Sequence, residues 1–216
     1  MPVSLAVDIW SDIACPWCYI GKRKFERGLA DFDGAADVTY HSYELSPDTP
    51  VDFDGSEVDF LTAYKGMAPE QVRQMLEQVR GIAASVGLDY HFDRVRHTRT
   101  LAAHQALHLA KEHGVQLELA EQLFAAYFVE GRHIGHVDEL ADLAADVGLD
   151  RAQTLQALES GTYARAVQAD IDQAQVYGIT AVPFFVLDGR YGVPGAQDPA
   201  VFTQVLTQAR DERLGG

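Results

Sequence analysis

Apolar residues near the start of the chain form a short run, "VSLAVDIW", at residues 3–10. A run of this length that is rich in Val, Leu and Ile predicts a buried strand. Residues 38–45, "VTYHSYEL", predict a second strand, and the turn residues "SPDTP" follow it. Apolar residues recur at helical spacing between the two runs: Cys18, Phe25, Leu29 and Phe32. The chain therefore begins with a predicted β-α-β unit.

Residues 56–178 have an almost wholly helical pattern. The segment "SEVD" at 56–59 is typical of a capping box, and Pro69 opens a helix with one apolar face. Glycine stands at most of the predicted helix ends, as left-handed caps require. Further helices are expected over 98–114, 117–131, 136–148, 151–161 and 163–178.

The pattern changes again after residue 178. The segment "ITAVPFFVLDGRYGV" predicts two strands joined by the Asp188-Gly189 turn. A closing amphipathic helix is expected over 197–210, with Asp198 as its N-cap and Pro199 at its first position. Without the helical block, the order of elements is that of thioredoxin. The predicted fold is α/β, thioredoxin-like, with an inserted all-helical domain.

The expected division places a thioredoxin-like domain at residues 1–54 plus 166–216 and a helical insertion domain at 55–165. The net charge of −15 argues against a nucleic-acid partner and an anionic membrane surface. No run approaches the ~20 apolar residues that a spanning helix needs. The first residues lack the pattern of a secretory signal, so we expect a cytoplasmic protein. The sequence does not indicate an oligomeric state.

The two cysteines of the chain, Cys15 and Cys18, stand three residues apart. Random placement would give this spacing in roughly one case in a hundred, so the pair requires a chemical reason. Half of a zinc site, a structural disulfide and a redox dithiol are the three candidates. Cytosolic thiols are normally kept reduced, which disfavours the structural disulfide.

Zinc is disfavoured because a structural zinc ion usually has four protein ligands and the chain has no second CxxC. His104 and His108 stand four residues apart, but Gln105 replaces the glutamate of an HExxH motif. We therefore expect no metal site. A pair of inert, buried cysteines stays open as an alternative, but a redox dithiol is favoured.

The dithiol is expected to open the first helix, with Pro16 at the first helical position. The helix N-terminus favours an anion, which predicts Cys15 as the attacking thiolate. Cys18 lies one turn further in and would resolve a mixed disulfide. Trp17 is expected either to hold an apolar peptide or to pack on the helical domain. Asp12 could relay protons to the thiols or cap the helix.

The segment "TAVPFF" supplies a second signal. A proline that directly precedes the last hairpin of a thioredoxin-like sheet is expected to be cis and to face the CxxC motif. Val182 would then expose edge-strand backbone groups beside the reactive sulfur. A substrate peptide could pair with this backbone, so Val182 and Pro183 are predicted substrate-binding residues.

These segments carry a family resemblance. "SDIACPWCYIGKRKFERGL", "AYFVEGRHIGHVDELADLAADVGLD" and "GITAVPFFVLDGRYGVPGAQ" resemble the active site, helical insertion and cis-proline hairpin of DsbA-family thiol oxidoreductases of the FrnE type. The resemblance implies Cys15 as nucleophile, Cys18 as its partner, and Val182 and Pro183 as substrate-facing backbone. It also implies protein or peptide disulfides as substrates.

The same superfamily includes 2-hydroxychromene-2-carboxylate isomerases and kappa-class glutathione transferases. These enzymes bind glutathione and place a serine where Cys15 stands, so the intact dithiol favours thiol–disulfide exchange. A disulfide-binding module without turnover is the non-enzymatic alternative. No tightly bound cofactor is expected, although glutathione could serve as reductant. The direction of exchange depends on the reduction potential, which the sequence does not give.

Overall fold

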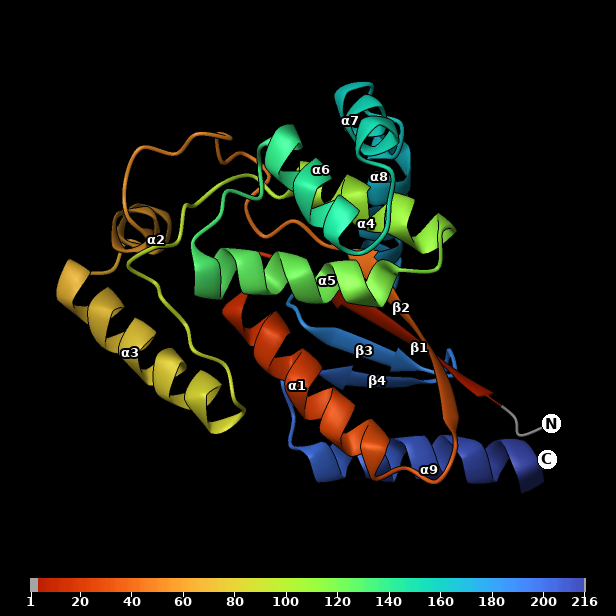
Figure 1. Cartoon of the computed structure of the whole chain (residues 1–216). Helices are drawn as coiled ribbons and strands as arrows, with labels where there is room; N and C mark the ends of the chain where they lie inside the picture. Colours follow the sequence, from red (N-terminus) through yellow and green to blue (C-terminus); the bar gives the residue numbers. More distant parts are fainter. Residues whose placement is uncertain (1–3, 216) are drawn as a thin grey trace.

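The computed structural model describes residues 4–215. Its centre is one four-stranded sheet with the strand order β2-β1-β3-β4 (Figure 1). The strands are β1 (Ser4–Ser11), β2 (Ala35–Ser42), β3 (Phe184–Leu187) and β4 (Tyr191–Pro194). Strand β1 pairs with β2 in parallel and with β3 antiparallel, and β3 and β4 form an antiparallel hairpin. The predicted thioredoxin-like α/β fold is confirmed.

Helix α1 (Pro16–Ala30) connects the two parallel strands, and α9 (Pro199–Gly215) follows the hairpin. The other helical segments lie between β2 and β3 in the chain. They are α2 (Glu57–Lys65), α3 (Pro69–Ser85), α4 (Leu101–Glu112), α5 (Gln116–Ala125), the π-helical turn η1 (Ala126–Glu130), α6 (Val137–Asp146), α7 (Arg151–Glu159) and α8 (Ala164–Val176).

Alternation along β1 and β3 gives the sheet two apolar faces, as a strand period of two requires. Ile9 and Phe185 pair across the strands and belong to the main core, in which Phe185 contacts Phe202 of α9. Trp10 and Val186 point to the other face and pack with Ala174 of α8. Helices therefore cover the sheet on both sides, and residue 15 lies at the end of its central strand β1.

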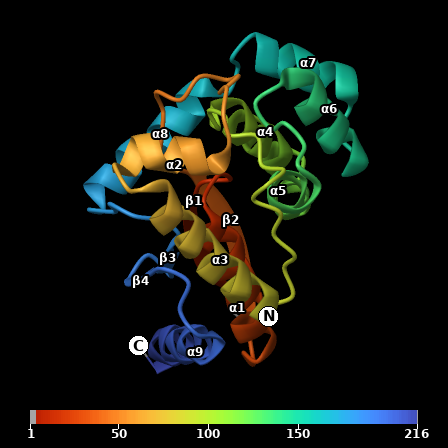
Figure 2. The same ribbon diagram turned by 90° about the vertical axis from the view of Figure 1, so that its left-hand side faces the viewer.

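The helical block is attached to the sheet through α1. Glu121 of α5 accepts hydrogen bonds from Lys22, at 2.6 Å, and from Arg23. Tyr19 of α1 stacks on Phe124 of α5. Figure 2 shows α3 in front of α1 and α2 above it, with α4 to α7 at the upper right. The predicted domain boundary at residue 165 falls just inside α8, and the division itself stays a prediction.

Local sequence signals explain several element boundaries. The predicted capping box is present, since Ser56 Oγ accepts from the Asp59 amide at 3.2 Å and Asp59 accepts from the Ser56 amide at 2.9 Å. Asp188 and Gly189 have φ values of 52° and 64°, as a tight hairpin turn requires. No helix among residues 4–215 has the length and hydropathy needed to cross a membrane.

Other predicted boundaries are wrong. The second strand ends at Ser42 rather than at residue 45, because the Leu45 amide leaves the sheet to donate to Asp12. The helix expected at 98–114 starts at Leu101, and the helix expected at 117–131 changes to π-helical geometry after Ala125. Val3, the first residue of the first predicted strand, lies outside the described residues.

Candidate active site

The CxxC motif forms the N-terminus of α1, immediately beyond the central strand β1. Cys15 is the N-cap residue in extended conformation, and Pro16 occupies the first turn, where no amide donor is needed. The Cys15 amide donates to the Asp12 carbonyl at 3.1 Å, and the Cys18 amide donates to the Cys15 carbonyl at 3.0 Å. Both thiols are free and buried. The positive end of the α1 helix dipole therefore lies at Cys15.

The two thiols have different surroundings. Burial raises the pKa of Cys18 well above its ordinary value, and hydrogen bonding to Cys15 raises it further. Ser11 and the Asp12 backbone oppose this shift without cancelling it. The Cys15 thiol lies 3.6 Å from the Val182 carbonyl oxygen, to which it donates. Cys18 is thus held as the protonated inner thiol, while Cys15 faces the loop that precedes β3.

That loop contains the Val182–Pro183 peptide bond, which is cis. Pro183 packs tightly on α1, because a Cβ atom added to Gly21 would lie 2.8 Å from Pro183 Cγ. The Pro183 carbonyl accepts a hydrogen bond from the Gly195 amide at 2.8 Å. The structure therefore brings Val182 and Pro183, predicted from sequence, next to the dithiol helix.

Asp12 is buried behind the motif, and its carboxylate fixes the surrounding loops. It accepts hydrogen bonds from the amides of Leu45 at 2.7 Å and Ala14 at 3.3 Å, and it pairs with His104 Nε2 at 3.3 Å. Burial favours the neutral acid, but the hydrogen bonds and the charge of His104 outweigh it and lower the pKa of Asp12. The helix-capping interpretation of Asp12 is wrong, because Cys15 occupies the N-cap position.

Tyr90 is a site residue that the sequence analysis missed. Its hydroxyl, on the segment between α3 and α4, donates to the Pro16 carbonyl at 2.8 Å. Its buried ring stacks between Tyr19 and Phe128. The helical block thus holds the backbone of the CxxC motif directly. A single tyrosine 72 residues after Cys18 in the chain carries no local sequence signal for this contact.

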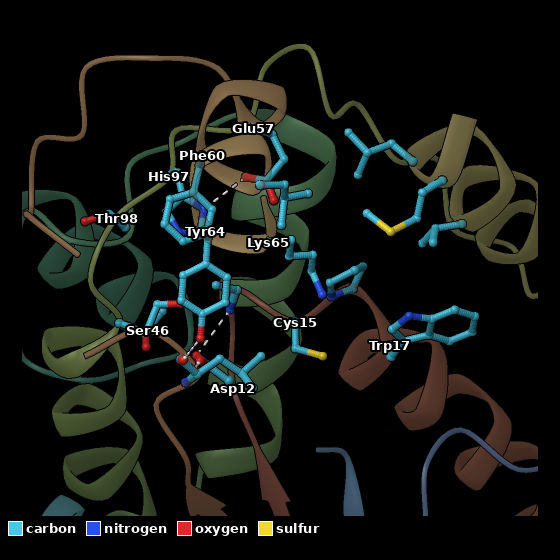
Figure 3. A pocket seen from close by; sticks show the side chains of 18 residues that line it. Asp12, Cys15, Trp17, Ser46, Glu57, Phe60, Tyr64, Lys65, His97 and Thr98 are labelled. Carbon is cyan, nitrogen blue, oxygen red and sulfur yellow. Dashed lines mark hydrogen bonds and ion pairs between the residues drawn. The ribbon is translucent and has the colours of Figure 1, made fainter. Parts of the chain in front are cut away.

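A cavity of about 200 Å³ opens beside Cys15 (Figure 3). Its walls come from α2, α3 and the loop that follows β2. Asp12, Pro16 and Trp17 also line it. The Trp17 side chain lies at this cavity and is 40% exposed. A dithiol therefore lies at a helix N-terminus, in contact with a cis-proline loop and beside an apolar cavity.

A family model described as "DSBA-like thioredoxin domain" matches residues 6–207. The chain belongs to the DSBA-like thioredoxin domain family. In this DSBA-like protein the match spans the sheet, the helical block and most of α9.

A solved structure from Streptomyces coelicolor, described as a probable DsbA oxidoreductase, SCO1869, is similar to this DSBA-like chain. The two are 42% identical with a TM-score of 0.89, over 97% of this chain and 91% of the other. A curated relative, the Bacillus subtilis protein YwbO, is 29% identical over 98% of this chain and 100% of its own length.

Two more distant structures show the fold alone. The cytosolic disulfide reductase DsbM from Pseudomonas aeruginosa, solved with GSH, is 20% identical with a TM-score of 0.64, covering 97% of this chain and 98% of its own. A 2-hydroxychromene-2-carboxylate isomerase is 14% identical with a TM-score of 0.68, covering 97% of each chain.

A group with metal-ligand side chains, Asp52, His133 and His136, borders a second cavity that neither cysteine lines. The His133 and His136 rings stack in parallel 3.7 Å apart, so their nitrogen lone pairs do not converge. The Gly135 amide donates to His133 Nδ1 at 3.1 Å, which leaves the ring proton on Nε2, the atom that faces Asp52. This arrangement fits a hydrogen bond between His136 Nε2 and Asp52, at 2.7 Å, better than a metal site.

Proposed function

We propose that the protein is a thiol–disulfide oxidoreductase that acts with the Cys15–Cys18 dithiol on protein or peptide disulfides. The observation that carries the proposal is the position of two free thiols in the first turn of α1, with Cys15 against the Val182 carbonyl. A helix N-terminus favours a thiolate at the outer cysteine. The raised pKa of Cys18 keeps the inner thiol protonated until it is needed.

The exchange proceeds in two steps. The Cys15 thiolate attacks one substrate sulfur, so a Cys15–sulfur bond forms, the substrate disulfide breaks, and the second substrate sulfur leaves as a thiolate that takes up a proton. Cys18 then loses its proton and attacks Cys15 Sγ, which releases the first substrate sulfur. Two electrons pass from the dithiol to the substrate, which becomes two thiols. The protein ends with a Cys15–Cys18 disulfide.

The surrounding residues supply the binding surface in this proposal. Pro16 and Trp17 lie beside Cys15 at the cavity, and Val182 and Pro183 offer backbone in the loop whose Val182 carbonyl contacts the Cys15 thiol. A substrate strand would pair with that backbone while its sulfur approaches Cys15. We also propose that Asp12, a buried acid whose backbone is hydrogen-bonded to Cys18, relays the Cys18 proton.

The proposed compartment is the cytoplasm. Its thiol pool holds dithiols largely reduced, so the protein would act as a reductase or isomerase. Glutathione is the proposed reductant, with two glutathione thiols oxidised to one disulfide for each dithiol regenerated. No other cofactor is proposed, and the proposed partners are disulfide substrates rather than nucleic acid or membrane.

Reduction of insulin disulfides by catalytic protein in excess glutathione tests this function. The wild type should turn over many times, whereas Cys15→Ser should fall to the uncatalysed rate. A wild-type rate equal to that without protein would overturn the proposal and favour a binding module without turnover.

A glutathione-dependent isomerase or kappa-like transferase is the second candidate, because the isomerase structure has the same fold. Cys15 stands against it, since those enzymes place serine at this position. Glutathione-dependent isomerisation of 2-hydroxychromene-2-carboxylate, or conjugation of glutathione to an aromatic electrophile, that survives in Cys15→Ser would favour this candidate over thiol–disulfide exchange.

A further inference from the structure

The cavity beside Cys15 has a composition suited to one aromatic group. Its apolar wall is formed by side chains of α2 and α3: Phe60, Leu61, Met75, Leu76 and Val79. Figure 3 shows α2 on one side of the cavity and α3 on the other, with Cys15 and Trp17 together on a third side. Apolar cavities of ~150 Å³ accept benzene, so about 200 Å³ is enough for one substituted ring.

One buried carboxylate interrupts this apolar wall. Glu57, at the first position of α2, is 7% exposed and points into the cavity (Figure 3). Its Oε2 atom lies 2.9 Å from His97 Nδ1. Within residues 4–215, its other oxygen has no hydrogen-bond partner. Protein atoms do not enclose this oxygen, so it is an open acceptor at the cavity wall that a donor inside the cavity can reach.

His97 supports the same conclusion. It lines the cavity with Glu57, its ring stacks on Phe60, and it is 5% exposed. Because Nδ1 faces a carboxylate, Nδ1 carries the ring proton and donates to Glu57. The Nε2 atom is buried and has no partner among the described residues. Glu57 is thus held by His97 through Oε2, and its Oε1 atom is an open acceptor at the wall, better suited to a donor than to an anion.

The charges in the lining favour a neutral donor. The charged side chains in the lining are Asp12, Glu57 and Lys65. The two carboxylates would repel an anionic group, and Lys65 would repel an ammonium group. The Asp12 oxygens already accept hydrogen bonds within the protein, which leaves Glu57 as the acceptor for a ligand. A phenol satisfies both conditions, because its ring is apolar and its hydroxyl donates one hydrogen bond. Met75 adds an adaptable, polarisable contact for such a ring.

We propose that this cavity is a specificity pocket for a tyrosine side chain adjacent to the disulfide cysteine of the substrate, with the phenol hydroxyl donating to Glu57. The inference rests on the proposed thiol–disulfide exchange at Cys15. It names the substrate class as peptides in which tyrosine directly neighbours the attacked disulfide.

Single-turnover reduction tests the pocket without an external reductant. Reduced protein is mixed with three peptide disulfides that are identical except for Tyr, Phe or Lys beside the cysteine, and the second-order rate constants are compared. A hydrogen bond to a charged acceptor predicts roughly a tenfold preference for Tyr over Phe. Lys should react more slowly than Tyr.

Two variants assign that preference to the pocket. Glu57→Gln keeps the side-chain size and should reduce the Tyr-over-Phe ratio to about threefold or less. Val79→Phe fills the cavity from α3 and should slow the Tyr and Phe peptides to the rate of the Lys peptide. The control Glu77→Gln changes an exposed carboxylate of α3 that pairs with Arg80, and it should keep the wild-type ratio. Circular dichroism confirms that each variant is folded.

Equal rates of the wild type with the Tyr and Phe peptides would overturn the proposed tyrosine specificity of the cavity, while leaving the proposed thiol–disulfide exchange intact. A faster reaction with the Lys peptide would overturn the proposal that the cavity binds a phenol and would favour an amine ligand. A Tyr preference that survives in both Glu57→Gln and Val79→Phe would place tyrosine recognition elsewhere. Failure of reduced wild type to act on any of the three peptides would overturn the proposed function and this inference with it.

Discussion

The hydroxyl of Tyr90 satisfies the Pro16 carbonyl in the middle of the CxxC motif. Pro16 has no amide hydrogen, so its carbonyl is its one backbone hydrogen-bonding group. Burial is the main cause that raises the pKa of Tyr90, and the nearby Cys15 and Cys18 raise it further. The hydroxyl therefore keeps its proton and acts as a permanent donor to the motif.

Tyr90→Phe should lower the free energy of unfolding by about 1 kcal/mol, because the buried hydrogen bond to the Pro16 carbonyl is lost. Tyr163→Phe is the matched control, since the Tyr163 hydroxyl bonds to Glu112 in an exposed position. Its cost should stay within about 0.5 kcal/mol. Urea denaturation of the reduced proteins measures both values, and equal costs would contradict the role assigned to Tyr90.

Sequence reasoning located the residues that belong to short motifs. Cys15, Cys18 and Pro183 each stand in a recognisable local pattern, and the fold brings these patterns together. Tyr90 and Glu57 lie far along the chain from the dithiol and have no such pattern. Their positions depend on how α2 and α3 pack against the start of α1, which propensity and periodicity do not specify.

At the scale of elements, α1 and α9 approach closely at Gly28. A Cβ atom added there would lie 2.5 Å from the Pro199 carbonyl oxygen and 2.8 Å from Phe202 Cβ. The missing side chain thus sets the distance between the two helices. Gly81 of α3 is different, because a Cβ atom added there would meet nothing within 4 Å.

Alanine at these two glycine positions should change the free energy of unfolding in opposite directions. Gly28→Ala should destabilise the protein by about 1–3 kcal/mol, since the helices must move apart. Gly81→Ala should stabilise it by up to about 1 kcal/mol, because alanine is the better helix former in open space. Urea denaturation of both variants checks the pair, and stabilisation by Gly28→Ala would contradict the packing described here.

His41 ties β2 to β1 and α8 through two carboxylates. Its ring nitrogens lie 2.8 Å from Asp8 and 2.8 Å from Asp170. Burial disfavours the charged ring, but the hydrogen bonds to Asp170 and Asp8 outweigh burial and raise the pKa of His41. The resulting stability is fully present below the unfolded-state pKa of about 6.5 and is lost as pH rises through the higher folded-state pKa.

His41→Asn should therefore cost about 2 kcal/mol at pH 6 and less at pH 9. His91→Asn is the control, because His91 pairs with the exposed Asp89 at 3.3 Å. Its cost should stay below about 0.5 kcal/mol at both values of pH. Urea denaturation at pH 6 and pH 9 measures the difference. A His41→Asn variant that loses more free energy of unfolding at pH 9 than at pH 6 would contradict the raised pKa of His41.

Element prediction succeeded where caps and turns have strong local chemistry, as at Ser56, Pro69 and Asp188-Gly189. It was wrong where tertiary contacts determine the end or the geometry of an element. The apolar pattern of 117–131 continues without a break, so it does not reveal the change to the π-helical turn η1. Similarly, Leu45 fits a strand pattern, but its amide is taken by Asp12.

For the whole molecule, one continuous core joins the sheet to the helical block. The same apolar cluster contains Ile9 and Phe185 of the sheet and Leu119 and Leu143 of the helices. The order of elements predicted the thioredoxin-like frame, because β-α-β and a hairpin are local signals. The sequence did not predict how the inserted helices share a core with that frame, since this depends on contacts between distant segments.

A shared core predicts cooperative unfolding. Far-ultraviolet circular dichroism follows mainly the helices between β2 and β3, whereas Trp10 and Trp17 fluorescence follows the thioredoxin-like part. The two signals should give the same urea midpoint within error, as a two-state transition requires. Two separated midpoints would show that the parts fold independently.

The central claim is that Cys15 attacks a disulfide and Cys18 resolves the product, and trapping tests it most directly. Reduced Cys18→Ser is mixed with a peptide disulfide, quenched with acid and mapped by mass spectrometry. A stable mixed disulfide on Cys15 is expected, with no such adduct accumulating in the wild type, where Cys18 releases it. The absence of any peptide adduct on Cys15 in the variant would contradict the account.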